Sequence, residues 1–158
     1  MPAVQDFYPD DFSHCYGCGR LNQSGLHIRT EWTGEEGKAE FNPRPEHVAV
    51  PGYVYGGLLA SLIDCHAVGT AAAAFMKAGG LKPGTDASPR FVTASLEVQF
   101  KKPTPLGVPL HLCARPVEVG ERKVIVEAVI TAEGIETVKG RVVAVPIPPN
   151  MAGKRGNP

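Results

Sequence analysis

Residues Pro51 to Phe75 read PGYVYGGLLASLIDCHAVGTAAAAF. After the pair Gly56-Gly57 comes a long, apolar, alanine-rich run without an internal proline, and its length predicts a helix rather than a strand. Glycine at a helix start exposes backbone N–H groups to a ligand, and the helix dipole favours negative charge there. The carboxylate of Asp64 interrupts the apolar run about two turns later, where an unused acid is costly. This pairing of an oxyanion-binding helix end with a half-buried acid points to acyl-transfer chemistry.

The composition restricts the classes of partner that the protein can have. The 158 residues suit one domain with its own core, and 43% of them are hydrophobic. The chain has 16 basic and 16 acidic residues, so it lacks the basic excess that nucleic acids or anionic membranes select. The longest apolar run contains Asp64 and His66, which argues against a membrane span, and the acidic N-terminus does not resemble a signal peptide. We expect a cytoplasmic protein without a nucleic-acid or membrane partner.

Strand patterns lie on both sides of the predicted helix. They cover Leu26–Trp32 and Lys38–Phe41 before it, and Phe91–Phe100, Val108–Val117, Lys123–Thr131 and Glu136–Val145 after it. Glu133-Gly134 suits a hairpin turn between the last two strands. An antiparallel sheet with its helix on one face is an α+β arrangement. One helix with a large apolar surface fits a curved sheet of about five to six strands wrapped around it.

Three segments carry a recognisable set of motifs. CYGCGRLNQSGLHI (15–28) is similar to a Cys-x-x-Cys-Gly…Asn-x-x-Gly-Leu opening. HVAVPGYVYGGLLASLIDCHAVG (47–69) is similar to a His-Gly-Gly…Asp core, with Tyr55 in place of the histidine. VTASLEVQFKKPTPLG (92–107) is similar to a Thr-x-x-Leu-x-Val…Pro…Gly strand. Together they resemble the hotdog-fold acyl-CoA thioesterases, in particular the branch similar to phenylacetate-pathway thioesterases.

That resemblance implies a division of the chain and an activity. A hotdog domain would cover residues 15–146, between an irregular lead-in (1–14) and a flexible C-terminal tail (147–158). The domain would hydrolyse an acyl-CoA thioester to free acid and coenzyme A, and no metal or other cofactor is implied.

The resemblance also implies roles for individual residues. Asp64 would attack the thioester or activate water as a general base, and partial burial should raise its pKa. Gly56 would donate its N–H to the thioester carbonyl. Thr93 would orient the acid or the water, and Tyr55 would replace the family histidine as a positioning group. The expected substrate-binding residues are Gly57, His47, Lys101 and Lys102, the two lysines as contacts for the coenzyme A phosphates.

The spacing of Gly56 and Asp64 bears on assembly. Eight residues separate them, which is roughly 12 Å along one helix, so one thioester carbon cannot touch both. If both act, they come from two chains whose helices run antiparallel, and the resemblance implies the same arrangement. We therefore expect a homodimer, extended to a dimer of dimers.

Structural interpretations compete with these roles. Asp64 can be an acid on an exposed or ion-paired helix side, and Gly56 can serve close packing at a helix start. Thr93 can be a β-forming residue and no more. His66 follows Asp64 by two residues, which turns it away from the face of Asp64.

The four cysteines are expected to be reduced, in keeping with a cytoplasmic protein. Cys15 and Cys18 form a Cys-x-x-Cys pair, but zinc would need two more ligands and no second such pair is present. A tight structural turn is the expectation for this pair. Cys65 and Cys113 look isolated and buried.

Two other functions stay open at this stage. A hydratase or dehydratase on the same fold would pair the acid with a catalytic histidine, and no histidine stands at a matching offset. A non-catalytic acyl-CoA binder or sensor is the second alternative, because Tyr55 replaces the family histidine.

Overall fold

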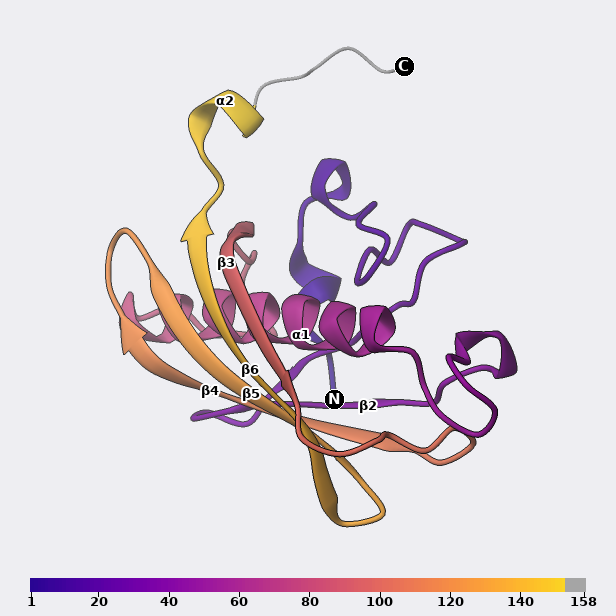
Figure 1. Cartoon of the computed structure of the whole chain (residues 1–158). Coiled ribbons are helices and arrows are strands. Elements are labelled where there is room, and N and C mark those ends of the chain that lie inside the picture. The colour runs from indigo at the N-terminus through magenta and orange to yellow at the C-terminus, as the bar shows by residue number, and fades with distance from the viewer. Residues whose placement is uncertain (153–158) are drawn as a thin grey trace.

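One long helix, α1 (Gly56–Ala78), runs through the centre of the computed structural model, which describes residues 1–152 (Figure 1). It begins at the glycine pair, as predicted. A glycine cap ends the helix, because Gly80 takes the left-handed conformation with φ +78° and directs the chain away from the helix axis. By length and composition α1 could cross a membrane, but 78% of its apolar window is buried within the fold. The helix is therefore the core helix of the domain.

Six strands form one antiparallel sheet that curves around α1 (Figure 1). Their bounds are β1 (Glu31–Trp32), β2 (Gly37–Phe41), β3 (Phe91–Phe100), β4 (Leu110–Val119), β5 (Val124–Ala132) and β6 (Ile135–Pro146). Their order across the sheet is β1-β2-β4-β5-β6-β3, so β3 lies at one edge and pairs with β6. The predicted α+β class and the curved sheet around one helix are confirmed.

The apolar core lies between α1 and the concave face of the sheet. Strands β2 to β6 all contact the helix. The helix approaches the sheet closely at two glycines: an added Cβ on Gly37 of β2 would lie 2.1 Å from Oγ1 of Thr70, and one on Gly140 of β6 would lie 2.3 Å from Cγ2 of Ile63. Glycine at these two positions lets α1 sit deep in the sheet. The largest apolar side chains with less than 2% exposure are Phe91, Leu58, Leu62, Ile63, Met76, Leu110 and Ile130.

Turn and strand-breaking residues in the second half of the chain lie where the sheet requires them. Glu133 and Gly134 both have positive φ, +52° and +78°, as a tight hairpin turn between β5 and β6 requires. Pro116 lies inside β4, next to an irregularity in the pairing with β5, which is where a sheet tolerates proline.

The predicted strand at Leu26–Trp32 is wrong for most of its length, since β1 contains only Glu31 and Trp32. His27 has φ +54°, which breaks the extended backbone. The N–H groups of Leu26 and Ile28 bond to the carbonyls of Tyr16 and Gly17, at 2.8 and 2.9 Å. The alternating pattern therefore reflects packing against the N-terminal segment and not membership of the sheet.

Short helical turns occupy the segments outside the sheet. They are η1 (Val4–Phe7), η2 (Asp10–Phe12), η3 (Pro45–His47) and α2 (Pro149–Ala152). η1 packs against α1, and α2 stands away from the sheet beyond β6 (Figure 1). The division at residues 14 and 147 stays a prediction, and residues 153–158 of the expected tail lie outside the described residues.

Candidate active site

Asp64 lies about two turns into α1 and faces the edge strand β3. Its Oδ1 accepts a hydrogen bond from Oγ1 of Thr93, so the acid and the hydroxyl that the sequence singled out are brought together. The carboxylate is half-buried. Desolvation raises the pKa of Asp64 above its ordinary value of 3.8, although the hydrogen bond from Thr93 opposes that rise. A partly dehydrated carboxylate held by one hydroxyl is suited to act as a base or a nucleophile.

The first turn of α1 lies between two aromatic rings. Tyr55 is the N-cap residue, but its side chain makes no capping hydrogen bond. A Cβ on Gly57 would lie 2.6 Å from Cε2 of Tyr55, and a Cβ on Gly56 would lie 3.2 Å from Cζ of Phe100. The absence of a side chain at both positions thus lets the two rings pack against the helix start, where Gly56 is half-buried and Gly57 is exposed.

Asp64 and Gly56 lie along the same edge of the molecule. Thr93 near the start of β3 contacts Asp64, and Phe100 at its end lies over Gly56. Within the described chain β3 pairs only with β6, so its outer edge is open. Along the helix the two candidate groups remain about 12 Å apart. The structure therefore places both at one open edge without joining them in one reaction centre within a chain.

Two lysines follow directly after Phe100. The N–H groups of Lys101 and Lys102 bond to the Thr137 carbonyl at 2.9 and 3.2 Å, which fixes the backbone beyond β3. Nζ of Lys101 pairs with Glu136 at 3.2 Å, and both lysines are exposed. Their sequence position next to Phe100 places positive charge near the start of α1.

His47 is almost fully buried, at 7% exposure. Its Nδ1 accepts the N–H of Arg44 at 3.0 Å, and its carbonyl accepts the N–H of Tyr55 at 3.1 Å. Desolvation lowers the pKa of the His47 ring. His47 thus holds the loop that leads to the helix start, and its part in substrate binding stays a prediction.

His66 is turned away from Asp64, as its spacing suggested. The ring is completely buried, with Nδ1 2.9 Å from Oγ1 of Thr30 and Nε2 3.1 Å from the carbonyl of Gly37. Burial lowers the pKa of His66 to about 4. It is a neutral core residue that ties α1 to the N-terminal segment.

The interpretation of Cys65 as an isolated cysteine is wrong. Its Sγ lies 3.9 Å from Sγ of Cys15, and the sulfurs of Cys15, Cys18 and Cys65 all lie within 4.8 Å of one another. None of the four cysteines forms a disulfide within the described residues. Hydrogen bonds from Cys18 and Cys65 lower the pKa of the Cys15 thiol. The same hydrogen bond between Cys18 and Cys15 raises the pKa of Cys18 to about 12. Sequence reasoning missed the cluster because 50 residues separate Cys15 from Cys65.

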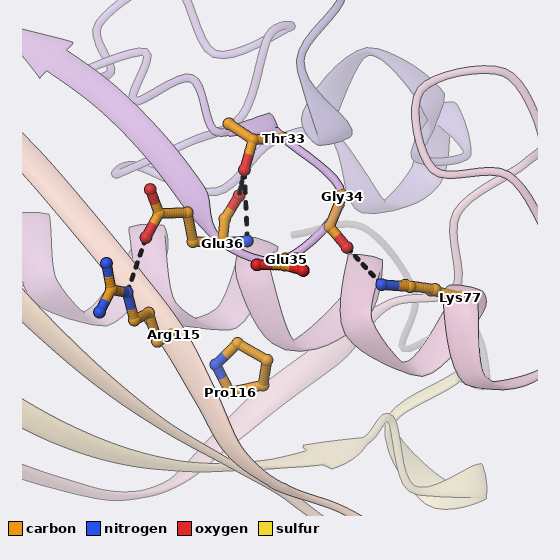
Figure 2. A pocket seen from close by; sticks show the side chains of 7 residues that line it. All are labelled: Thr33, Gly34, Glu35, Glu36, Lys77, Arg115 and Pro116. Atoms are coloured by element: carbon orange, nitrogen blue, oxygen red, sulfur yellow. Dashed lines mark hydrogen bonds and ion pairs between the residues drawn. The ribbon is translucent and has the colours of Figure 1, made fainter.

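A polar hollow of about 750 Å³ lies near the other end of α1 (Figure 2). Its lining residues are Thr33, Gly34, Glu35, Glu36, Lys77, Arg115 and Pro116. Charged groups of the hollow are hydrogen-bonded to other lining residues. Glu36 accepts a hydrogen bond from Nε of Arg115 at 2.7 Å, and Lys77 donates to the Gly34 carbonyl. None of the candidate catalytic residues lines this hollow.

The curved antiparallel sheet around one central helix is the hotdog fold. The chain belongs to the thioesterase superfamily, whose family model matches residues 51–139. This assignment confirms the resemblance on which the sequence interpretation drew.

Solved structures support the same assignment. A thioesterase superfamily protein from Shewanella loihica PV-4 is 43% identical, with a TM-score of 0.66 over 88% of this chain and 98% of that chain. The Escherichia coli PaaI protein from the phenylacetic acid degradation operon is 15% identical, with a TM-score of 0.63 over 78% and 81% of the two chains. The thioesterase HI1161 from Haemophilus influenzae is 14% identical, with a TM-score of 0.65 over 82% and 85%. The last two show the fold alone. No curated protein matches the chain.

Proposed function

We propose that this thioesterase-superfamily protein hydrolyses an acyl-CoA thioester to free acid and coenzyme A. The observation that carries the proposal is the Asp64–Thr93 pair, a half-buried carboxylate of raised pKa held by a hydroxyl at the open edge of the sheet. Superfamily membership supports thioesterase chemistry in general. The proposal also includes three more specific points: an acyl-CoA substrate, the roles of single residues and a cytoplasmic location.

Asp64 supplies the attacking group in this mechanism. In one route Asp64 attacks the thioester carbonyl and expels the thiolate of coenzyme A, and water then hydrolyses the acyl–Asp64 anhydride to the free acid and the regenerated carboxylate. In the other route Asp64 removes a proton from water, which attacks the carbonyl, and the departing thiolate takes up that proton. The Thr93 hydroxyl fixes the orientation of the carboxylate. A backbone N–H at Gly56 of the partner subunit stabilises the negative charge that develops on the carbonyl oxygen. Tyr55 positions the substrate with its hydroxyl group.

The exposed edge strand supports a site shared by two chains. A ten-residue edge strand with an open side invites pairing with another chain. Antiparallel pairing of β3 with its own copy about a two-fold axis would set the helix start of each chain toward the acid of the other. Exposed apolar side chains lie on β3 itself and in the segment that leads to α1: Leu96, Phe100, Val48, Val50, Tyr53 and Tyr55. We propose a homodimer on this basis, with a dimer of dimers as its further assembly.

The proposal assigns the thioester end of the substrate to the helix start and the coenzyme A phosphates to the lysines beyond β3. Gly57 offers a second N–H to the carbonyl oxygen, and the dipole of α1 favours negative charge at this end. Lys101 and Lys102 supply positive charge for the phosphates. His47 contributes by fixing the loop before the helix.

Release of free coenzyme A thiol from a panel of acyl-CoA esters tests the activity. Wild-type protein should release thiol from at least one ester. Asp64→Asn should lower kcat by about 10²–10⁴-fold while leaving the fold intact. Asp11→Asn, which changes an exposed acid of the lead-in, is the matched control and should keep full activity. Near-normal turnover by a folded Asp64→Asn protein would remove Asp64 from the mechanism.

A non-catalytic acyl-CoA binder is the alternative that one observation favours. The Tyr55 ring lies over Gly57 at the helix start, where the related motif has a histidine. Calorimetry with the same esters separates the two functions. Saturable binding without any thiol release would establish the binder, whereas turnover in the panel would exclude it.

A further inference from the structure

Three cysteine sulfurs converge beside the candidate active site. Cys15 and Cys18 come from the Cys-x-x-Cys turn, and Cys65 comes from α1, one residue after Asp64. The sulfurs of Cys15 and Cys65 are 3.9 Å apart. Two sulfurs that share a tetrahedral zinc ion at a Zn–S distance of about 2.3 Å lie about 3.8 Å apart. The observed separation therefore suits two ligands of one ion.

The turn is shaped around its sulfur atoms. The backbone N–H groups of Gly17 and Cys18 help to lower the pKa of the Cys15 thiol. A Cβ on Gly17 would lie 2.3 Å from Sγ of Cys65, so glycine is needed for the turn to approach α1. A Cβ on Gly19 would lie 2.5 Å from the backbone nitrogen of Cys15, so the turn closes only with glycine there as well. N–H donors that surround a thiolate are typical supporting contacts of a metal ligand.

The positive charge of Arg90 is within electrostatic range of the three sulfurs. The guanidinium of Arg90 interacts electrostatically with Cys15, Cys18 and Cys65. Its Nη1 is buried and has no hydrogen-bond partner among the described residues, and the group stacks on Tyr8 with its Cζ 5.0 Å from the ring centroid. Three thiolates and one divalent cation carry a net charge of about −1, which one guanidinium neutralises. With the charge of Arg90 the whole group would be neutral.

We propose that Cys15, Cys18 and Cys65 bind one thiophilic divalent cation of the zinc class. Water takes the fourth position, since the described residues place no fourth ligand side chain in the cluster. The ion would fasten the Cys-x-x-Cys turn to α1 at the residue after Asp64. A disulfide is the rival, but it would use only two of the three sulfurs and would not need the charge of Arg90.

Cobalt(II) is the probe, because its bonds to thiolates absorb light. It is added under argon to reduced, chelator-treated full-length protein. We expect one Co²⁺ per chain, with a sulfur-to-cobalt charge-transfer band and visible bands of tetrahedral intensity, and loss of both when Zn²⁺ is added. Zn²⁺ should also raise the melting temperature, because it binds the folded chain.

Three variants assign the signal to the cluster. Cys65→Ser and Cys15→Ser, at half-buried positions, should each abolish the charge-transfer band or lower Co²⁺ affinity at least about tenfold. Cys113→Ser is the matched control and should bind as wild type does, because Cys113 contacts Glu36 outside the cluster. Circular dichroism verifies that each variant is folded. No charge-transfer band in reduced wild-type protein, or an unchanged band in Cys65→Ser, would overturn the proposal.

Discussion

Two inactive variants, mixed in one dimer, test whether each site takes Gly56 from one chain and Asp64 from the other. Gly56→Val places a branched side chain where even a Cβ would lie 3.2 Å from the Phe100 ring, so it covers the helix start. Asp64→Asn removes the acid and retains the shape of the side chain. Because the two positions are about 12 Å apart on one helix, no reacting carbon can reach both within a chain.

The expected recovery follows from pairing statistics. Random association makes about half of the dimers mixed, and each mixed dimer has one site with both wild-type groups. The mixture should therefore recover about a quarter of wild-type activity. Mixed dimers isolated with two different affinity tags should recover about half.

Thiol release is measured for the mixture and for each parent, and each parent alone should be inactive. A site built within one chain leaves every mixed dimer inactive, since each chain then carries one defect. Isolated mixed dimers with no more activity than their parents would therefore refute the shared site.

Three further predictions concern residues around the site. Tyr55→Phe should lower turnover modestly and Tyr55→His should retain or raise it, as measured by thiol release; an inactive, folded Tyr55→His protein would indicate a different substrate or reaction. Lys102→Ala should raise KM for an acyl-CoA but not for the same acyl group on pantetheine, which lacks the nucleotide phosphates, whereas Lys82→Ala, beyond the far end of α1, should change neither KM. Because burial lowers the pKa of His66 from 6.5 to about 4, the unfolded chain binds the proton first, so the free energy of unfolding should fall by on the order of 3 kcal/mol as the pH drops from above 6.5 to below 4. Urea titrations across that range should show that the free energy of unfolding depends less on pH in His66→Gln than in the wild type. An equal pH dependence in the two proteins would contradict the interpretation of His66 as a buried, neutral residue.

Local patterns predicted most of the fold because they depend on neighbours in sequence. The glycine pair at the start of α1 and the turn at Glu133-Gly134 both lie where expected. The Asp64–Thr93 contact joins residues 29 positions apart, and the family resemblance supplied it, since neither residue alone is distinctive.

Contacts made by irregular backbone were beyond this kind of reasoning. The alternation at Leu26–Trp32 looked like a strand because packing against the N-terminal segment produces the same period of two. The cluster of Cys15 and Cys65 depends on how the N-terminal segment crosses α1, which no spacing in the sequence encodes.

The order of strands in the sheet has a consequence for how the site forms during folding. β6 is the last strand in sequence, yet it lies between β5 and β3. Until β6 has been synthesised and inserted, β3 has no partner within the chain to hold it against α1, and Thr93 cannot be fixed beside Asp64. Pairings of this kind are slow because the intervening chain must close first. We therefore expect the hydroxyl and the acid to meet late in folding, and a nascent chain halted before β6 to expose β3 on both edges.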